Sequence, residues 1–381
     1  MKVCCAVTTP SLKTDRPIGI GLNEKDMTKV TNLPTYVNGK DCRLDKKYFP
    51  SPYELEHIDF AKQLASETLA NNQTARLEML LARITSREEY DNSLNWLQRV
   101  KEHMQSEKTP EKNNMDEKYL SRWEIIKTCE GNKVDKWVEW IEPLILQSRH
   151  PFAYRRCRHS SPIYWDIKRA YASFPSNASN PGFNNVDYIL LKSGLDVYRG
   201  SSGKEKIKHY LLDAGSSTFD SSLWWFICAY SQRKVNWDAV FAWELTPLMP
   251  TKYWEAIPAH FKPYWHFYNS PVKSSKNHPD SPFTYIRQIS SEADFVSLKL
   301  DIDSPSTEIP LFEQLVSDKD GVFSLVDEFF FELHYRCEVM GPCGWGDKIP
   351  QKYGSLELDR VHALQAFSTL REKGIRAHFW P

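Results

Sequence analysis

The chain of 381 residues has no excess of charge of either sign, because 49 Lys and Arg residues balance 49 Asp and Glu residues. A neutral chain has no overall electrostatic attraction for nucleic acid or for an anionic membrane. No apolar run approaches the roughly 20 residues of a transmembrane helix, and the opening MKVCCAVTTP turns polar too soon for a signal peptide. These absences predict neither nucleic acid nor a membrane as partner. They favour a cytoplasmic location, with the lumen of the secretory pathway as the alternative if an anchor has been trimmed.

Two binding motifs are also missing. None of the eight cysteines forms a Cys-x-x-Cys pair, which argues against a zinc finger. Cysteines scattered over so long a chain are mostly buried thiols, although Cys337 and Cys343 are close enough in sequence to form a bridge. The glycine-containing turn LLDAGSS lacks the Gly-x-Gly-x-x-Gly pattern of an ordinary dinucleotide site.

Aromatic residues, in contrast, are abundant at 13% of the chain. Such a chain can bury a large core and is not disordered. Residues 1–50 show little periodicity and predict an irregular arm. Residues 51–184 predict a helical domain, because apolar residues recur three and four apart in YELEHIDFAKQLASETLA. The helical interpretation extends over YLSRWEIIKTC and DKWVEWIEPLILQ.

Residues 185–381 alternate short apolar runs with helical segments, which predicts an α/β domain with a Rossmann-like parallel sheet. KHYLLDAG, AVFAWE and DFVSLKLDID are typical of strands, and VDYILLKSGLDVYRG predicts a hairpin or a pair of strands. Ligands of parallel sheets bind beyond the carboxyl ends of the strands. The residues that follow each apolar run are therefore the candidates for function.

Two of these strand ends predict a nucleoside site. Asp213 ends the first strand, and Gly215 in the following turn allows a ligand close to the main chain. The helix after this turn would point its N-terminus at that ligand. Glu244 ends the second strand and suits the two hydroxyl groups of a ribose. The alternatives are an ordinary capped turn and an exposed carboxylate.

Two further strand ends carry acids and a histidine. Asp301 and Asp303 follow the strand in DFVSLKLDIDSPSTE, where they repel each other unless a cation or a hydroxyl ligand lies between them. Glu332 and His334 follow the strand in DEFFFELHY and suit a general base or a pair of metal ligands. A salt-bridge network and a structural histidine are the alternatives.

Together, LLDAGSS, FAWE, DFVSLKLDIDSPSTE and FFFELHY resemble the FkbM-like family of S-adenosylmethionine-dependent methyltransferases, over about residues 185–381. The resemblance implies a class I, Rossmann-like fold and S-adenosyl-L-methionine as cofactor. Within it, Glu244 would hold the ribose hydroxyls and Asp301 would face the methyl-transfer zone. The residues that the resemblance places around the cofactor are Asp213, Gly215, Ser216, Ser217, Glu244, Asn269, Ser270 and Asp301.

The predicted reaction is O-methylation of a sugar, a glycan or another hydroxylated small molecule. His334 is the candidate base, with Glu332 and Asp301 as further catalytic candidates. Asp301 and Asp303 are candidate ligands of Mg²⁺. The competing predictions are a nicotinamide-dependent oxidoreductase and a non-catalytic binding protein on the same kind of sheet.

Two other stretches are candidates for the acceptor side. Residues 148–165 mix arginines with aromatic side chains, which suits a phosphate, a carboxylate or a glycan, or a basic turn that docks two domains. Residues 337–348 are rich in glycine and predict a loop over the active site.

Overall fold

The computed structural model describes residues 42–66, 72–84, 86–106, 114–129, 132–145, 186–200, 207–318, 321–337 and 348–380. The predicted arm up to residue 41, the arginine-rich stretch 148–165 and most of the glycine-rich loop 337–348 lie outside the described residues. The predictions made for those segments therefore stay predictions.

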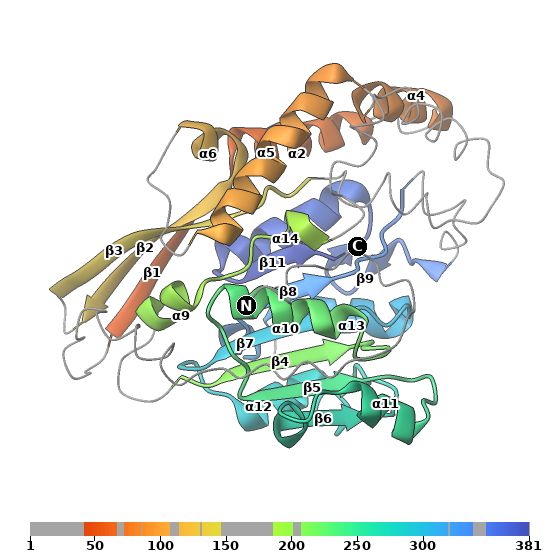
Figure 1. Cartoon of the computed structure of the whole chain (residues 1–381). Helices are drawn as coiled ribbons and strands as arrows, with labels where there is room; N and C mark the ends of the chain where they lie inside the picture. The colour runs from red at the N-terminus through yellow and green to blue at the C-terminus, as the bar shows by residue number, and fades with distance from the viewer. Residues whose placement is uncertain are drawn as a thin grey trace, which may run out of the picture.

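A six-stranded parallel sheet forms the centre of the molecule, which confirms the predicted α/β class (Figure 1). Every pairing in it is parallel. The strands run in the order β11-β8-β7-β4-β5-β6. Their bounds are β4 (His209–Ala214), β5 (Ala239–Trp243), β6 (Trp265–Tyr268), β7 (Phe295–Leu300), β8 (Glu328–Phe331) and β11 (Arg376–Phe379).

The order of these strands creates a switch point between β4 and β7. The chain first builds outward from β4 through β5 to β6, then returns to β7 on the other side of β4 and continues to β8 and β11. Numbered along the chain, this is the order 3-2-1-4-5-6 of nucleotide-binding sheets. Loops that leave β4 and β7 in opposite directions open a crevice at their carboxyl ends.

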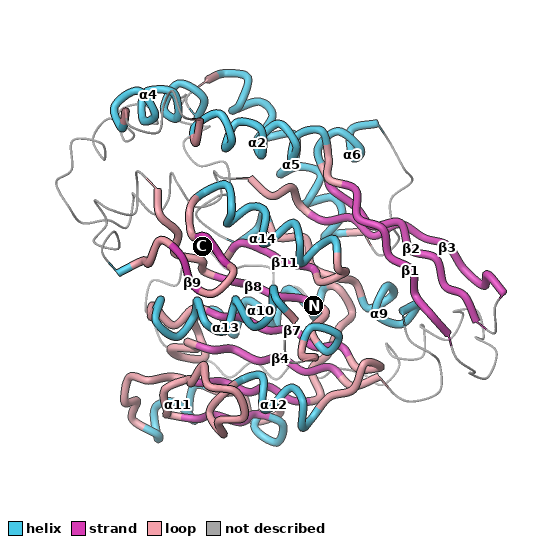
Figure 2. Tube along the Cα trace, turned by 180° about the vertical axis from the view of Figure 1, so that it is seen from behind, coloured by secondary structure: helices cyan, strands magenta, loops and turns pink. Residues whose placement is uncertain are grey.

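Helices cover both faces of the sheet, as the opposite views of Figure 1 and Figure 2 show. One core contains Leu212, Leu298 and Phe331 from the strands, and α12, α13 and α14 pack on that face. The other contains Leu211 and Phe330, under α10 and α11. The helices are α10 (Ser222–Gln232), α11 (Pro250–Ala256), α12 (Pro282–Ile289), α13 (Pro305–Ser317) and α14 (Arg360–Glu372). Burial on both faces explains the nearly continuous apolar runs of the strands.

The amino-terminal half contains a three-stranded antiparallel sheet, so the prediction of a mainly helical region is wrong in part. Its strands are β1 (Cys42–Phe49), β2 (Ser121–Cys129) and β3 (Asn132–Ile141). The first of these, β1, lies within residues 1–50, which the sequence predicted to be an irregular arm. Alternate residues of β2 are buried, which is the period of a strand and not of a helix. The helices of this half are α2 (Pro52–Leu64), α4 (Gln73–Ile84), α5 (Arg87–Gln105) and α6 (Asn114–Tyr119).

The predicted strands in VDYILLKSGLDVYRG are also wrong. This segment forms the short helices η4 (Val186–Tyr188) and α9 (Gly194–Gly200). Its apolar middle is buried, and carboxylates bind its main chain where a strand partner would otherwise be needed. The N–H of Leu190 donates to Glu142 at 3.0 Å, and that of Lys192 donates to Glu328 at 3.1 Å. The remaining short elements are η5 (Lys262–Tyr264), η6 (Phe323–Leu325), β9 (Lys352–Tyr353) and β10 (Leu356–Glu357).

A disulfide and a buried ion network hold the amino-terminal half in place. Cys42 and Cys129 form a disulfide between the start of β1 and the end of β2. The bridge suggested between Cys337 and Cys343 stays a prediction, since Cys343 lies outside the described residues. The fully buried guanidinium of Arg371 on α14 pairs with Glu54 of α2 and with Glu142. These pairs connect three separate segments of the chain.

Candidate functional site

The residue that follows each strand of the parallel sheet lies at the carboxyl edge of that sheet. Parallel strands end at one edge, so these residues line a common region. Five of the six were predicted from the sequence as site residues, and Trp380 was not. They are Gly215, Glu244, Asn269, Asp301, Glu332 and Trp380.

Gly215 lets the loop after β4 pass directly against the end of β7. Its φ is +89°, a conformation that favours glycine, and a Cβ atom there would lie 1.7 Å from the carbonyl oxygen of Asp301. The N–H groups of Gly215 and Ser216 both donate to the carbonyl of Trp243, at 3.0 and 2.9 Å. The loop is therefore held between the ends of β5 and β7, at the switch point.

Glu244 joins this loop to the end of β5. One carboxylate oxygen accepts a hydrogen bond from the N–H of Ser217 at 2.8 Å, and the other accepts from the N–H of Thr246 at 2.7 Å. The structure thus brings Glu244 and the glycine loop together, as the sequence predicted. Ser217 is exposed beside them, with a φ of +52°.

Asn269 shapes the loop that follows Glu244. Its amide donates to the carbonyl of Glu244 at 2.7 Å and accepts from the N–H of Leu248 at 3.0 Å. The neighbouring predicted residue, Ser270, donates to Asp280 at 3.2 Å. On the loop fixed in this way, the side chain of Leu245 is 69% exposed. Leu245 was missed in the sequence, where an exposed leucine looks like a core residue.

Asp213 is buried under the loop and belongs to a charged pair. Its side chain is 0% exposed, and one oxygen lies 3.0 Å from the ammonium of Lys299 on β7. The other oxygen accepts from the hydroxyl of Ser222 at 3.1 Å. The ammonium also donates to the carbonyl of Gly215 at 3.1 Å. The structure therefore places Asp213 behind the loop, where it supports the main chain.

Asp301 completes this charged group at the carboxyl end of β7. Its carboxylate lies 3.1 Å from Lys299 and accepts from the indole N–H of Trp380 at 3.0 Å. Burial alone would lower the pKa of Lys299, but the carboxylates of Asp213 and Asp301 outweigh it and raise that pKa. Lys299 is thus a fixed ammonium, and the side chain of Asp301, 22% exposed, is the more accessible of its two acidic partners.

Asp303 leaves β7 in another direction and meets the two predicted residues after β8. A carboxylate oxygen of Asp303 lies 3.8 Å from Nε2 of His334. Asp303, Glu332 and His334 each offer a ligand atom within 4.8 Å of the others. Asp301, which the sequence pairs with Asp303 as a metal ligand, is held by Lys299 and Trp380 and lies outside this group; that pairing stays a prediction.

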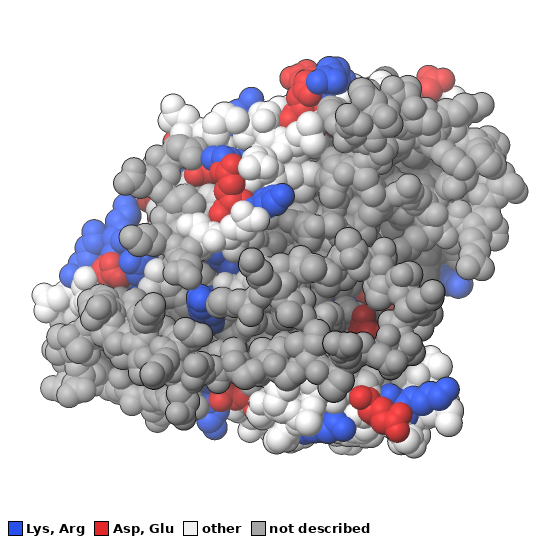
Figure 3. All heavy atoms as spheres, in the orientation of Figure 1, with Lys and Arg blue, Asp and Glu red and all other residues white. Residues whose placement is uncertain are grey.

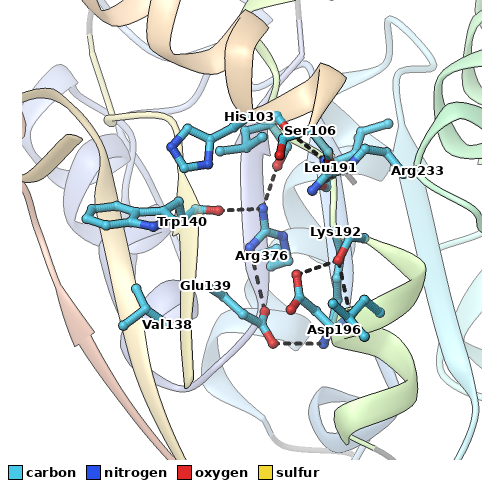
Figure 4. A pocket seen from close by; sticks show the side chains of 13 residues that line it. His103, Ser106, Val138, Glu139, Trp140, Leu191, Lys192, Asp196, Arg233 and Arg376 are labelled. Carbon is cyan, nitrogen blue, oxygen red and sulfur yellow. Dashed lines mark hydrogen bonds and ion pairs between the residues drawn. The ribbon is translucent and has the colours of Figure 1, made fainter. Parts of the chain in front are cut away.

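A separate cavity lies at the opposite, amino-terminal edge of the sheet, where Arg376 begins β11 (Figure 4). Lys192, Arg233, Asp196 and Glu139 line it with Arg376. Its volume of about 20 Å³ suits roughly one water molecule, whereas a cofactor site needs about 300 Å³ or more. Arg376 and Lys192 lie 3.7 and 3.8 Å from the carboxylate of Glu139. These ion pairs connect β3 to β11 of the parallel sheet and to the segment before α9, which is a structural role.

Charges of both signs occur on the described part of the surface (Figure 3). On the face shown in Figure 3, acidic and basic side chains of the described residues lie side by side. No helix among them is both long and apolar enough to cross a membrane. Comparisons with models of protein families, with curated proteins and with solved structures gave no match.

Proposed function

We propose that this chain is an S-adenosylmethionine-dependent methyltransferase that methylates a hydroxyl group of a sugar, a glycan or another small molecule. The observation that carries the proposal is the contact of Glu244 with the glycine loop at the switch point of the sheet. A ribose bound between them would lie in the position where parallel sheets of this order hold nucleosides.

Glu244 has capacity left for a ribose. A carboxylate accepts at about four lone-pair sites, and two of these already bind the N–H groups of Ser217 and Thr246. The remaining sites suit the two ribose hydroxyls. The exposed side chain of Leu245 next to Glu244 offers an apolar surface for the adenine ring.

The charges favour a sulfonium over a pyrophosphate. Asp213 and Asp301 flank the single ammonium of Lys299, so this group carries one net negative charge at the loop. A net negative charge attracts the cationic sulfur of S-adenosylmethionine and repels the pyrophosphate of a nicotinamide dinucleotide. The loop also contains one glycine where a pyrophosphate site commonly has three.

The acceptor would bind beyond the ends of β7 and β8, where His334 lies. In the transfer, the S–CH₃ bond breaks with its electron pair left on sulfur, and the acceptor oxygen forms the new O–CH₃ bond. The hydroxyl proton passes to a base, for which Nε2 of His334 is the candidate. Asp303, 3.8 Å from that nitrogen, would accept a hydrogen bond from the ring or from the sugar.

Calorimetric titration with S-adenosylhomocysteine tests the cofactor directly. We expect saturable binding of one molecule per chain, which Glu244→Ala abolishes. Glu255→Ala is the matched control, because Glu255 is an exposed carboxylate on the nearby α11. Thermal unfolding followed by circular dichroism confirms that both variants fold.

Titration with NAD and NADP distinguishes the methyltransferase from the rival function, a nicotinamide-dependent oxidoreductase. The all-parallel order 3-2-1-4-5-6 also occurs in dinucleotide-binding sheets, and an acid after the second strand binds their ribose. Binding of NAD or NADP without binding of S-adenosylhomocysteine would refute the methyltransferase and support an oxidoreductase.

A further inference from the structure

Asp303, Glu332 and His334 form a compact group of side chains that can ligate a metal ion. They follow the neighbouring strands β7 and β8 and offer ligand atoms within 4.8 Å of one another. The 3.8 Å between Nε2 of His334 and Oδ1 of Asp303 is shorter than the roughly 4.2 Å that two ligands, each about 2.1 Å from a shared ion, can span. A single ion therefore fits between these two atoms without a large movement of the backbone.

A buried carboxylate lies on the side of this histidine that faces away from Asp303. Nδ1 of His334 lies 3.8 Å from Oε2 of Glu308, and the two side chains are 3% and 1% exposed. The other oxygen of Glu308 accepts from the N–H of Ile302 at 2.8 Å, which fixes the carboxylate against the end of β7. Histidines that bind metals commonly donate a hydrogen bond from their second ring nitrogen to a carboxylate, and Glu308 lies on that side of the ring at ion-pair distance. Nε2 is then the ligand atom.

Negative charge also gathers around this histidine. Three carboxylates, those of Asp303, Glu332 and Glu308, surround one imidazole. Among the described residues, His334 is the side chain that lies within ion-pair distance of the buried Glu308. A buried carboxylate is costly unless a positive charge or several donors compensate it. A divalent ion on Nε2 fixes the proton of the ring on Nδ1, where it faces Glu308.

We infer that Asp303, Glu332 and Nε2 of His334 bind one divalent transition-metal ion, of the class of Mn²⁺ or Zn²⁺. An imidazole ligand favours these ions over Mg²⁺, which prefers oxygen ligands alone. The side chain of Asp303 is 70% exposed, whereas that of His334 is 3% exposed. The ion is thus open to solvent on the Asp303 side, as in catalytic sites that keep a position for substrate.

The role of the ion rests on the proposed methyl transfer, although its binding does not. An acceptor oxygen in the open position would lose its proton to water more readily, because a bound cation lowers the pKa of a hydroxyl. His334 then binds the ion instead of acting as the base, and the proton of the acceptor hydroxyl passes to solvent. This arrangement selects acceptors with a hydroxyl next to a second oxygen, such as sugars, since two oxygens can occupy neighbouring positions on the ion.

A second group of similar composition provides the control. Glu357, Asp359 and His362 also lie within 4.8 Å of one another. Their side chains are 41–49% exposed. Asp359 already accepts from the N–H of His362 at 3.0 Å, which caps α14, and from Nδ1 of the same ring at 2.8 Å. This group is explained as a helix cap, and it has no buried carboxylate behind its histidine among these contacts.

The test is calorimetric titration of the metal-stripped full chain with Mn²⁺ and, separately, with Zn²⁺. We expect one ion per chain and a loss of affinity greater than about 10-fold in His334→Gln and in Asp303→Asn. Glu308→Gln should weaken binding about 10- to 100-fold, since it removes the charge behind the ring. Glu357→Gln should leave the affinity unchanged. Circular dichroism melting curves verify that each variant folds.

Absence of saturable binding, or binding that survives His334→Gln, would overturn the inference. The cofactor titration gives an independent result, because Glu244→Ala should abolish binding of S-adenosylhomocysteine and retain binding of Mn²⁺. A chain that binds Mn²⁺ but not S-adenosylhomocysteine keeps the metal site and loses the proposed function. The reverse result keeps the methyltransferase and returns His334 to the role of base.

Discussion

Replacement of Gly215 by alanine should damage the switch point more than an ordinary glycine replacement. The φ of +89° costs an L-residue about 1–2 kcal/mol. The new Cβ would also start 1.7 Å from the carbonyl oxygen of Asp301, whereas such contacts essentially never fall below 3.0 Å. The end of β7 would have to move by about 1.3 Å. Overpacking of this kind costs about 1–3 kcal/mol more, so the free energy of unfolding should fall by about 2–5 kcal/mol.

Urea unfolding followed by circular dichroism measures this loss, and Gly321→Ala is the matched control. Gly321 has a φ of +65° with no atom within 4 Å of the position of a Cβ. Gly321→Ala therefore costs only the strain of an L-residue at a positive φ, about 1–2 kcal/mol. Gly215→Ala should further weaken binding of S-adenosylhomocysteine, which Gly321→Ala should not. Equal destabilisation by the two variants would refute the close approach of the glycine loop to β7.

Three further predictions concern stability. Burial opposes the ionisation of Glu142, but His378 outweighs it and holds the pKa of Glu142 below its ordinary value. The resulting stabilisation is complete above the unfolded pKa of about 4.3 and is lost as the pH falls through the lowered pKa. The urea concentration at the unfolding midpoint should therefore decrease as the pH is lowered below 4, and it should decrease less steeply in Glu142→Gln. Loss of the Cys42–Cys129 bridge, which spans 87 residues, should cost about 2–5 kcal/mol; dithiothreitol should lower the melting temperature of the wild type more than that of Cys42→Ser. Lys299→Met should cost about 3–5 kcal/mol in urea unfolding because it leaves a buried carboxylate without its cation, and an unchanged midpoint would contradict this.

The parallel sheet could be predicted because its strands are buried on both faces. Such strands read as continuous apolar runs bounded by turns, as in HYLLDA of β4 and FVSLKL of β7. The antiparallel sheet was missed because Trp123, Ile125 and Ile126 on β2 satisfy both a helical spacing and a strand alternation. The segment 186–192 was assigned to strands because its apolar residues are buried, whereas its main chain is bound by side chains from elsewhere.

The candidate site was predictable where position along a strand decides it. Glu244, Asp301 and Glu332 each follow a strand directly, and this position can be predicted without knowledge of side-chain contacts. Other features depend on residues far apart in the sequence. Trp380 reaches Asp301 across 79 residues, and the burial of Asp213 follows from its pairing with Lys299, 86 residues away. Periodicity carries no signal for such pairs.

The disulfide illustrates the same limit. The balance of charges is a property of composition and needs no fold. The Cys42–Cys129 bridge is a property of the fold, since it requires β1 and β2 to be neighbours in register. Composition and periodicity therefore carry no signal for this bridge.

The end of β7 explains how one short segment serves both halves of the site. Asp301 turns toward Lys299 and the glycine loop, whereas Asp303, two residues later, turns toward His334. The reversal is possible because Asp303 adopts a φ of +54°, outside the strand conformation. Between them, the N–H of Ile302 is held by Glu308. In the proposed function, the same three residues of backbone would therefore position the cofactor half and the acceptor half of the site.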